Sequence, residues 1–205
     1  MNNKESIIVY IEGQEDLLPV TASAGSSGFD LRSRLSLVIE PGETVLIPSG
    51  IRLAMPEGIE AQVRPRSGLS LRTSLRIPNT PGTIDSDFRD EVCIIAENTN
   101  SLYFDGSILL KNPDLVAKMH LAYRPVQFSE YFHRKTGQHL AFGVSDHTLY
   151  LDEAGHPVGS IYIEAGERIA QLVFAKVINP DFIQVDKVAE IGRNRGGGFG
   201  SSGSF

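Results

Sequence analysis

The chain has 205 residues, enough to bury the core of one all-β domain, and a net charge of −6 at pH 7. The negative balance argues against broad, sequence-independent binding of nucleic acid, which requires many Lys and Arg contacts to phosphate. The only cysteine, Cys93, cannot form an internal disulfide, and no apolar run approaches the roughly 18 residues that span a bilayer. We therefore expect a soluble, cytoplasmic protein without a membrane partner.

Short apolar runs between glycine and proline turns recur along the chain and predict β-strands. They cover residues 7–11, 44–48, 51–53, 59–63, 92–95 and 171–177. The turn signals between them favour a β-sandwich, barrel or jelly roll over alternating βα units. We expect a mainly β chain in which residues 1–205 form a single domain.

The stretch from about residue 101 to residue 156 interrupts this rhythm, and we interpret it as an insertion. Asn112 and Pro113 are typical of an N-cap and a first helical residue, and predict a helix that ends at Arg124. The apolar residues 140, 142 and 144 alternate as in extended chain. Residues 148–151 and 158–163 are expected to form a hairpin across 152–155. The five histidines of the insertion show no i, i+4 pair, which argues against a zinc site.

Two segments carry residue types suited to phosphate chemistry. Arg66, Ser67 and Gly68 follow a predicted strand and combine a forked cation, a hydroxyl and a close backbone approach. Asp85 and Asp87 alternate after Gly82 and should share one side of an extended strand. Taken singly, the first segment is more simply an ordinary charged turn and the second a solvated strand edge.

The glycine-rich tail, residues 192–205, is by composition a flexible arm.

Taken together with residues 26–31 and 166–172, these segments resemble the five motifs of the trimeric dUTP pyrophosphatase (dUTPase) family, in the family's order. The matches cover the chain except the insertion. The spacings from Arg66 to Asn79 and from Ser67 to Asp85 are also those of the family. The resemblance implies a jelly-roll subunit and a homotrimer whose active sites are each built from all three chains. It implies hydrolysis of dUTP to dUMP and pyrophosphate.

The resemblance also assigns the nucleoside and phosphate contacts. The uracil hairpin corresponds to Asn79, Gly82, Thr83 and Ile84, with Cys93 on the hairpin's second strand. Asp85 corresponds to the catalytic carboxylate that activates water for in-line attack on the α-phosphorus. Ser67 and Gln171 correspond to further catalytic residues: Ser67 is expected to meet the charge that develops on the bridging oxygen, and Gln171 to contact the phosphates. Arg66 and Gly68 also bind the phosphates, with Mg²⁺ chelated by the triphosphate and held through water by Asp30. For Asp30, bracing a turn after Gly28 is the alternative interpretation.

Two positions depart from the family pattern. Phe88 stands where tyrosine usually packs beneath the deoxyribose; its ring still leaves no space for a 2′-hydroxyl, so we expect dUTP to be chosen over UTP. The tail is one residue shorter between its arginine and its phenylalanine than the family's. Arg193 or Arg195 could therefore contact the γ-phosphate, while Phe199 and Gly200 would close over the uracil.

Two other functions remain open from the sequence. A dCTP deaminase of the same fold needs a glutamate three residues before Asn98, where this chain has Ile95, and Glu97 is in the wrong register. A nucleotide-binding module that recruits a protein partner through the aromatic-rich insertion is the second alternative.

Overall fold

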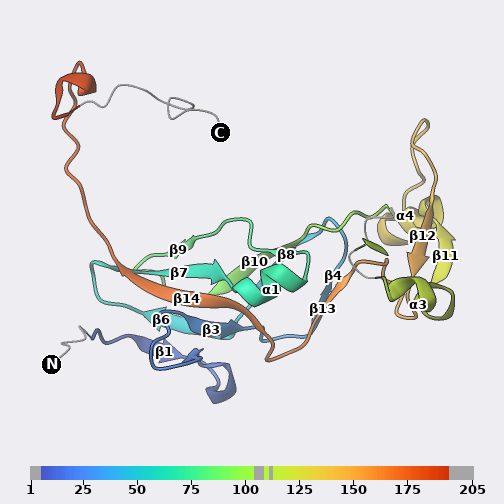
Figure 1. Ribbon diagram of the computed structural model, residues 1–205, viewed down its shortest axis with the longest axis horizontal. Coiled ribbons are helices and arrows are strands. Elements are labelled where there is room, and N and C mark those ends of the chain that lie inside the picture. Colours follow the sequence, from blue (N-terminus) through green and yellow to red (C-terminus); the bar gives the residue numbers. More distant parts are fainter. Residues whose placement is uncertain (1–5, 104–108, 111–112, 194–205) are drawn as a thin grey trace.

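The computed structural model describes residues 6–103, 109–110 and 113–193. Figure 1 shows a strand-rich body and, at one end of it, a smaller part formed by the expected insertion. No helix in these ranges is long and apolar enough to cross a membrane.

The body is a β-sandwich of jelly-roll type, and all its strand pairs are antiparallel. The largest sheet has the order β2 (Val20–Thr21), β3 (Phe29–Arg32), β14 (Arg168–Lys176), β7 (Ile59–Pro65) and β9 (Gly82–Ile84). The other pairings are β5 (Thr44–Pro48) with β10 (Cys93–Asn98) and β8 (Leu75–Arg76), β13 (Ile161–Ile163) with β4 (Leu37–Ile39), and β1 (Tyr10–Glu12) with β6 (Arg52–Ala54). The expected mainly β class is confirmed.

The core lies between the layers because side chains alternate along each strand. In β7, Ile59, Ala61 and Val63 are buried while their neighbours point outward. At the end of β10, the buried Asn98 donates from its side-chain amide to the carbonyl oxygens of Ile39 (2.9 Å) and Gly159 (2.8 Å). A buried amide needs such partners, so this residue ties together the points where the chain leaves and rejoins the body.

The smaller part contains α3 (Leu115–Ala122), β11 (Arg124–Gln127), α4 (Phe128–Thr136) and β12 (Thr148–Leu151). It has an apolar centre of its own, formed by Val126, Tyr131, Leu149 and Leu151. The helix expected after Pro113 is confirmed as α3, although its N-cap is Asp114 and Asn112 lies outside the described residues.

Two expectations for this part are wrong. β12 pairs with β11 and β13 pairs with β4, so beyond one bridge from Leu151 to Pro157 the expected hairpin of 148–151 with 158–163 does not continue. Gly159, at φ 91°, turns the chain away toward the body. The stretch 140–144 is not a strand and Phe142 is fully exposed; alternation does not make a strand where no neighbouring edge accepts it.

The carboxylate of Glu40, in the turn after β4, fastens α4 to the body. It accepts hydrogen bonds from Lys135 Nζ (2.6 Å), His156 Nδ1 (2.8 Å) and the Tyr131 hydroxyl. Burial raises the pKa of this carboxyl, but hydrogen bonds from Lys135, Tyr131 and His156 together outweigh it, and the net effect lowers the pKa. A lowered folded-state pKa means that the stabilisation is present at neutral pH and is lost as the pH falls through that value.

Glu40→Gln should therefore loosen α4 at neutral pH, at a cost of about 1–3 kcal/mol, because it leaves Lys135 and Tyr131 without their charged acceptor. Hydrogen exchange of the α4 amides and thermal melting measure the effect. The difference from wild type should shrink at acidic pH, where Glu40 is protonated. Glu153→Gln, at an exposed turn of the same part, is the control. Equal exchange in both variants would contradict this role for Glu40.

Candidate functional site

The predicted site residues fall into two groups at different places along β7. Ala61 pairs with Ile84 and Val63 with Gly82, so Asp85 lies beside the start of β7. Arg66 and Ser67 follow the end of β7. With a rise of about 3.3 Å per residue, Asp85 and Arg66 are roughly 20 Å apart along the sheet. One chain therefore does not bring these two residues together.

The group beyond the end of β7 is organised around Asp30 of β3. Arg66 Nε lies 3.0 Å from Asp30 Oδ1, and Arg168 Nη1 lies 3.1 Å from Asp30 Oδ2. Arg66 Nη1 also donates to the carbonyl oxygen of Arg168 at 2.8 Å. Asp30 lies in β3, Arg168 in β14, and Arg66 directly after β7, and these three strands are adjacent in the sheet. The sequence alone does not reveal this strand order. Asp30 thus braces two arginines, and its contact to a metal through water stays a prediction.

Gln171 sits in β14 between Asp30 and Arg64, its partners on the flanking strands. Its Nε2 donates to the carbonyl oxygen of Pro65 at 2.9 Å, immediately before Arg66. A Cβ placed on Gly28 would lie 2.1 Å from Gln171 Oε1. The absence of a side chain at Gly28 therefore leaves the space that the Gln171 amide occupies when it bonds to Pro65.

Gly28→Ala should displace the Gln171 amide and weaken its bond to Pro65 while leaving the fold intact, because the clashing atom is the end of a flexible side chain. We expect turnover to fall by about threefold to tenfold, the value of one hydrogen bond between neutral groups. Steady-state kinetics with thermal melting test this. Gly25→Ala, where an added Cβ meets nothing within 4 Å, is the matched control.

The helix α1 (Ser67–Arg72) begins directly after Arg66, which is its N-cap. Ser67 is exposed and Gly68 is half-buried, so both are open to a ligand from this side. The three residues predicted to contact phosphate are thus consecutive at the start of one short helix.

The other group lines a narrow hollow of about 60 Å³. Five predicted residues meet there, Asn79, Gly82, Thr83, Ile84 and Cys93, together with Val63 and Ile95. A Cβ on Gly82 would come within 2.9 Å of Asn79 Nδ2, so glycine is needed for this close packing. Burial, and then the charge of Glu91, raise the pKa of the Cys93 thiol. The thiol therefore stays protonated at neutral pH, so Cys93 lines the hollow and does not act as a nucleophile.

The expected alternation of Asp85 and Asp87 along a strand is wrong. β9 ends at Ile84, and Phe88 N donates to the Asp85 carbonyl oxygen at 3.2 Å, which closes a turn. The Asp85 side chain is exposed at this turn, and Phe88 is 39% exposed beside it. Asp85 is thus presented to solvent on a turn rather than on a flat strand edge.

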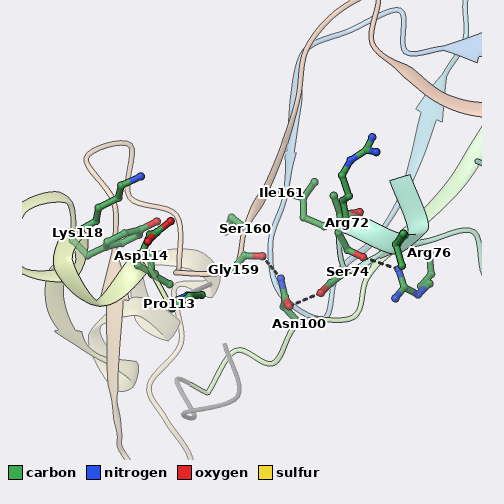
Figure 2. A pocket seen from close by; sticks show the side chains of 14 residues that line it. Arg72, Ser74, Arg76, Asn100, Pro113, Asp114, Lys118, Gly159, Ser160 and Ile161 are labelled. Atoms are coloured by element: carbon green, nitrogen blue, oxygen red, sulfur yellow. Dashed lines mark hydrogen bonds between the residues drawn. The ribbon is translucent and has the colours of Figure 1, made fainter. Parts of the chain in front are cut away.

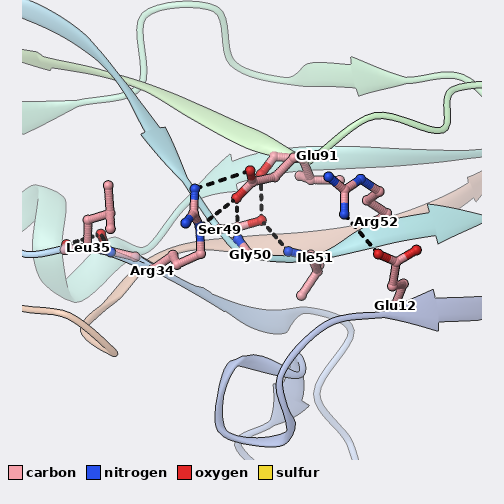
Figure 3. A network of polar contacts seen from close by, with 10 residues as sticks. Glu12, Arg34, Leu35, Ser49, Gly50, Ile51, Arg52 and Glu91 are labelled. Carbon is pink, nitrogen blue, oxygen red and sulfur yellow. Dashed lines mark hydrogen bonds and ion pairs between the residues drawn. The ribbon is translucent and has the colours of Figure 1, made fainter.

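The far end of this loop is anchored by Glu91. Its Oε1 accepts from Gly50 N at 2.7 Å and from Arg34 Nε at 3.1 Å, and the hydroxyl of Ser49 donates to the carbonyl of Val92 (Figure 3). With β9 paired to β7 at the near end, the loop that carries Asp85 is fixed at both ends.

Metal ligands are sparse in this region. The described ranges contain no group of three His, Cys, Asp or Glu side chains that could hold an ion. Asp30 is engaged by two arginines. Mg²⁺ prefers oxygen ligands and binds proteins through few carboxylates plus substrate phosphates, so the residues fit an ion that arrives on a triphosphate rather than a resident ion.

Arg195, Phe199 and Gly200 lie outside the described residues. Arg168 was missed, although it lies within the segment 166–172 that the sequence singled out.

Comparison with known proteins supplies the family context. The sequence model of the dUTPase family matches residues 15–139 and 157–203. A deoxyuridine 5′-triphosphate nucleotidohydrolase of Brucella melitensis biotype 1 is 33% identical over 202 residues, covering 96% of this chain and 92% of that protein. That of Chlamydia caviae is 48% identical over 95 residues, covering 45% of this chain and 64% of that protein, so the match spans under two thirds of this relative.

Solved structures show the same fold. A single-substitution mutant of the dUTPase of Staphylococcus bacteriophage 80alpha with dUpNHpp superposes with a TM-score of 0.65 at 23% identity, over 96% of this chain and 99% of that chain. A dUTPase from phage phi11, described with a structural Mg(II) ion, has a TM-score of 0.61 at 21% identity, over 89% of this chain and 99% of that chain.

Proposed function

The chain belongs to the dUTPase family, and from this premise we propose that it hydrolyses dUTP to dUMP and pyrophosphate. The observation that carries the proposal is the hollow where Asn79, Gly82, Thr83, Ile84 and Cys93 meet. Its narrowness suits the edge of a single-ring base and leaves no room for a purine. Pairing of a base edge with hairpin backbone would reject cytosine, whose donor and acceptor pattern would leave buried groups unmatched.

The chemistry follows from the two groups of residues. Asp85 accepts a proton from a water molecule, whose oxygen attacks the α-phosphorus opposite the bridging oxygen. The bond from the α-phosphorus to that oxygen breaks, and pyrophosphate leaves with the electron pair. Ser67, Gly68 and Arg66 meet the charge that develops there, while Gln171 holds the preceding carbonyl and so the position of Arg66.

Mg²⁺ is part of the substrate in this proposal. Chelated by the triphosphate, it neutralises charge and orients the phosphates. Asp30 would hold this ion through water, and its ion pairs fix the guanidinium groups of Arg66 and Arg168.

The active protein is a homotrimer with shared sites. Support comes from the roughly 20 Å between Asp85 and Arg66 within one chain, too far for both to act on one triphosphate. A second support is the segment that follows β14, which leaves the body in Figure 1 and exposes Ile178, Phe182 and Ile183 almost fully. Apolar side chains in an extended segment need a surface to cover them, and another copy of the chain supplies it.

Residues 1–205 form one domain, with residues 101–156 added at its end and residues 192–205 as the closing arm. Activity is expected to survive excision of the added part. Its separate apolar centre supports this, because the body keeps its own core.

Product analysis with dUTP, dCTP and UTP tests the proposed function. We expect dUMP and pyrophosphate from dUTP, no ammonia from dCTP, and slow cleavage of UTP because Phe88 crowds a 2′-hydroxyl. Ile95, at the position where a deaminase needs glutamate, is an apolar wall of the hollow. Release of ammonia from dCTP would favour the deaminase instead.

A further inference from the structure

Arg72, the last residue of α1, reaches back to the start of its own helix. A Cβ built on Gly68 would lie 3.1 Å from Arg72 Nη1 and 3.5 Å from Nη2. Long side chains on a helix point toward its N-terminus, which explains this direction. The guanidinium therefore rests against a residue that is expected to touch phosphate.

The guanidinium of Arg72 is available to bind a ligand. In the described part of the chain it forms no hydrogen bond or ion pair, and it is exposed. Arg66 differs, because it shares Asp30 with Arg168 and donates to a backbone carbonyl. The cluster of two arginines and one aspartate keeps a single net positive charge, while a triphosphate carries several negative ones.

The space around Arg72 lets it move. It lines a cleft of about 760 Å³ between α1, β8 and α3. Figure 2 shows Arg72 and Arg76 on one wall, and Asp114 and Lys118 on the other. The insertion therefore does not bury the guanidinium. Arg76, by contrast, donates to the carbonyl oxygens of Thr73 (2.8 Å) and Leu75 (2.7 Å).

We propose that Arg72 is a substrate-binding residue that contacts the terminal phosphates of the nucleotide whose phosphate tail lies on Ser67 and Gly68. This rests on the proposed function and extends it. A guanidinium pairs with phosphate oxygens through two parallel hydrogen bonds, and a swing over Gly68 brings Arg72 to them. Because dUMP lacks the terminal phosphates, Arg72 distinguishes the triphosphate substrate from the monophosphate product.

Binding measurements on Arg72→Gln test the proposal. Affinity for a non-hydrolysable dUTP analogue with Mg²⁺, measured by calorimetry, should fall about tenfold or more, the effect of one hydrogen bond between charged groups. Affinity for dUMP should stay unchanged, and the KM for dUTP should rise. Arg72→Lys, which keeps the charge but not the fork, should recover part of the loss. Thermal melting and trimer mass should match wild type.

Arg76→Gln is the matched control, since it removes an exposed guanidinium from the same cleft wall and should leave analogue binding unchanged. If Arg76→Gln weakened analogue binding as much as Arg72→Gln, the effect would come from the overall positive charge of the cleft wall. That result would overturn a direct contact between Arg72 and phosphate. Unchanged analogue binding in Arg72→Gln, or equal loss of dUMP binding, would also overturn it. These results leave the proposed function standing if wild type hydrolyses dUTP, whereas an inactive wild type that does not bind the analogue overturns both.

Discussion

Asp85→Asn is expected to lower the rate of pyrophosphate release from dUTP by about 10²- to 10⁴-fold, the usual contribution of a positioned general base. The amide keeps the shape of the side chain and cannot take the proton from water. Because Asp85 is exposed at a turn and the loop is held by β9 and Glu91, the fold should not change. Binding of a dUTP analogue should therefore persist.

Asp87→Asn is the natural control for this experiment. It removes an exposed carboxylate two positions away in the same turn, so it lowers the local negative charge equally. Near wild-type turnover is expected. If both variants lost the same activity, the effect would come from the charge of the turn, and the role of Asp85 as base would be wrong.

Mixing two inactive variants should restore activity. If Asp85 of one chain acts with Ser67 of another, an Asp85→Asn chain and a Ser67→Ala chain can jointly form sites that hold both native residues. Random assembly of equal amounts into trimers gives roughly a quarter of the wild-type sites. The measurement is pyrophosphate release after the variants are unfolded together and refolded.

Refolding each variant alone, followed by mixing of the intact trimers, is the control and should give little recovery. Failure to recover activity after joint refolding, with trimers present by mass, would mean that each chain carries a whole site. The strand register within one chain argues against that outcome, because it places Asp85 and Ser67 beside different ends of β7.

The body of the fold could be read from the sequence because burial alternates along its strands. The run at residues 44–48 coincides with β5, where turns on both sides fix its limits. The insertion was harder. α4 was missed although Gly137, at φ 72°, and the basic residues of its last turn are typical of a helix end.

The residues of the site could be predicted from the sequence, but their positions relative to one another could not. The residues that the family motif assigns to the uracil hairpin do line one hollow, because they are close in sequence or lie on the adjoining strand. The pairing of Asp30 with Arg66 and Arg168 could not be foreseen, since it depends on the order β3, β14, β7. For the same reason, the sequence spacing of Ser67 and Asp85 says nothing of their separation within one chain.

Hydrolysis of dUTP in water enriched in ¹⁸O tests most directly whether water attacks the α-phosphorus. Mass spectrometry of the two products locates the oxygen that came from solvent. The proposed mechanism predicts that dUMP carries the label and that pyrophosphate does not. Label in pyrophosphate would mean attack at the β-phosphorus and would contradict the assignment of Asp85 and Ser67 to either side of the α-phosphate.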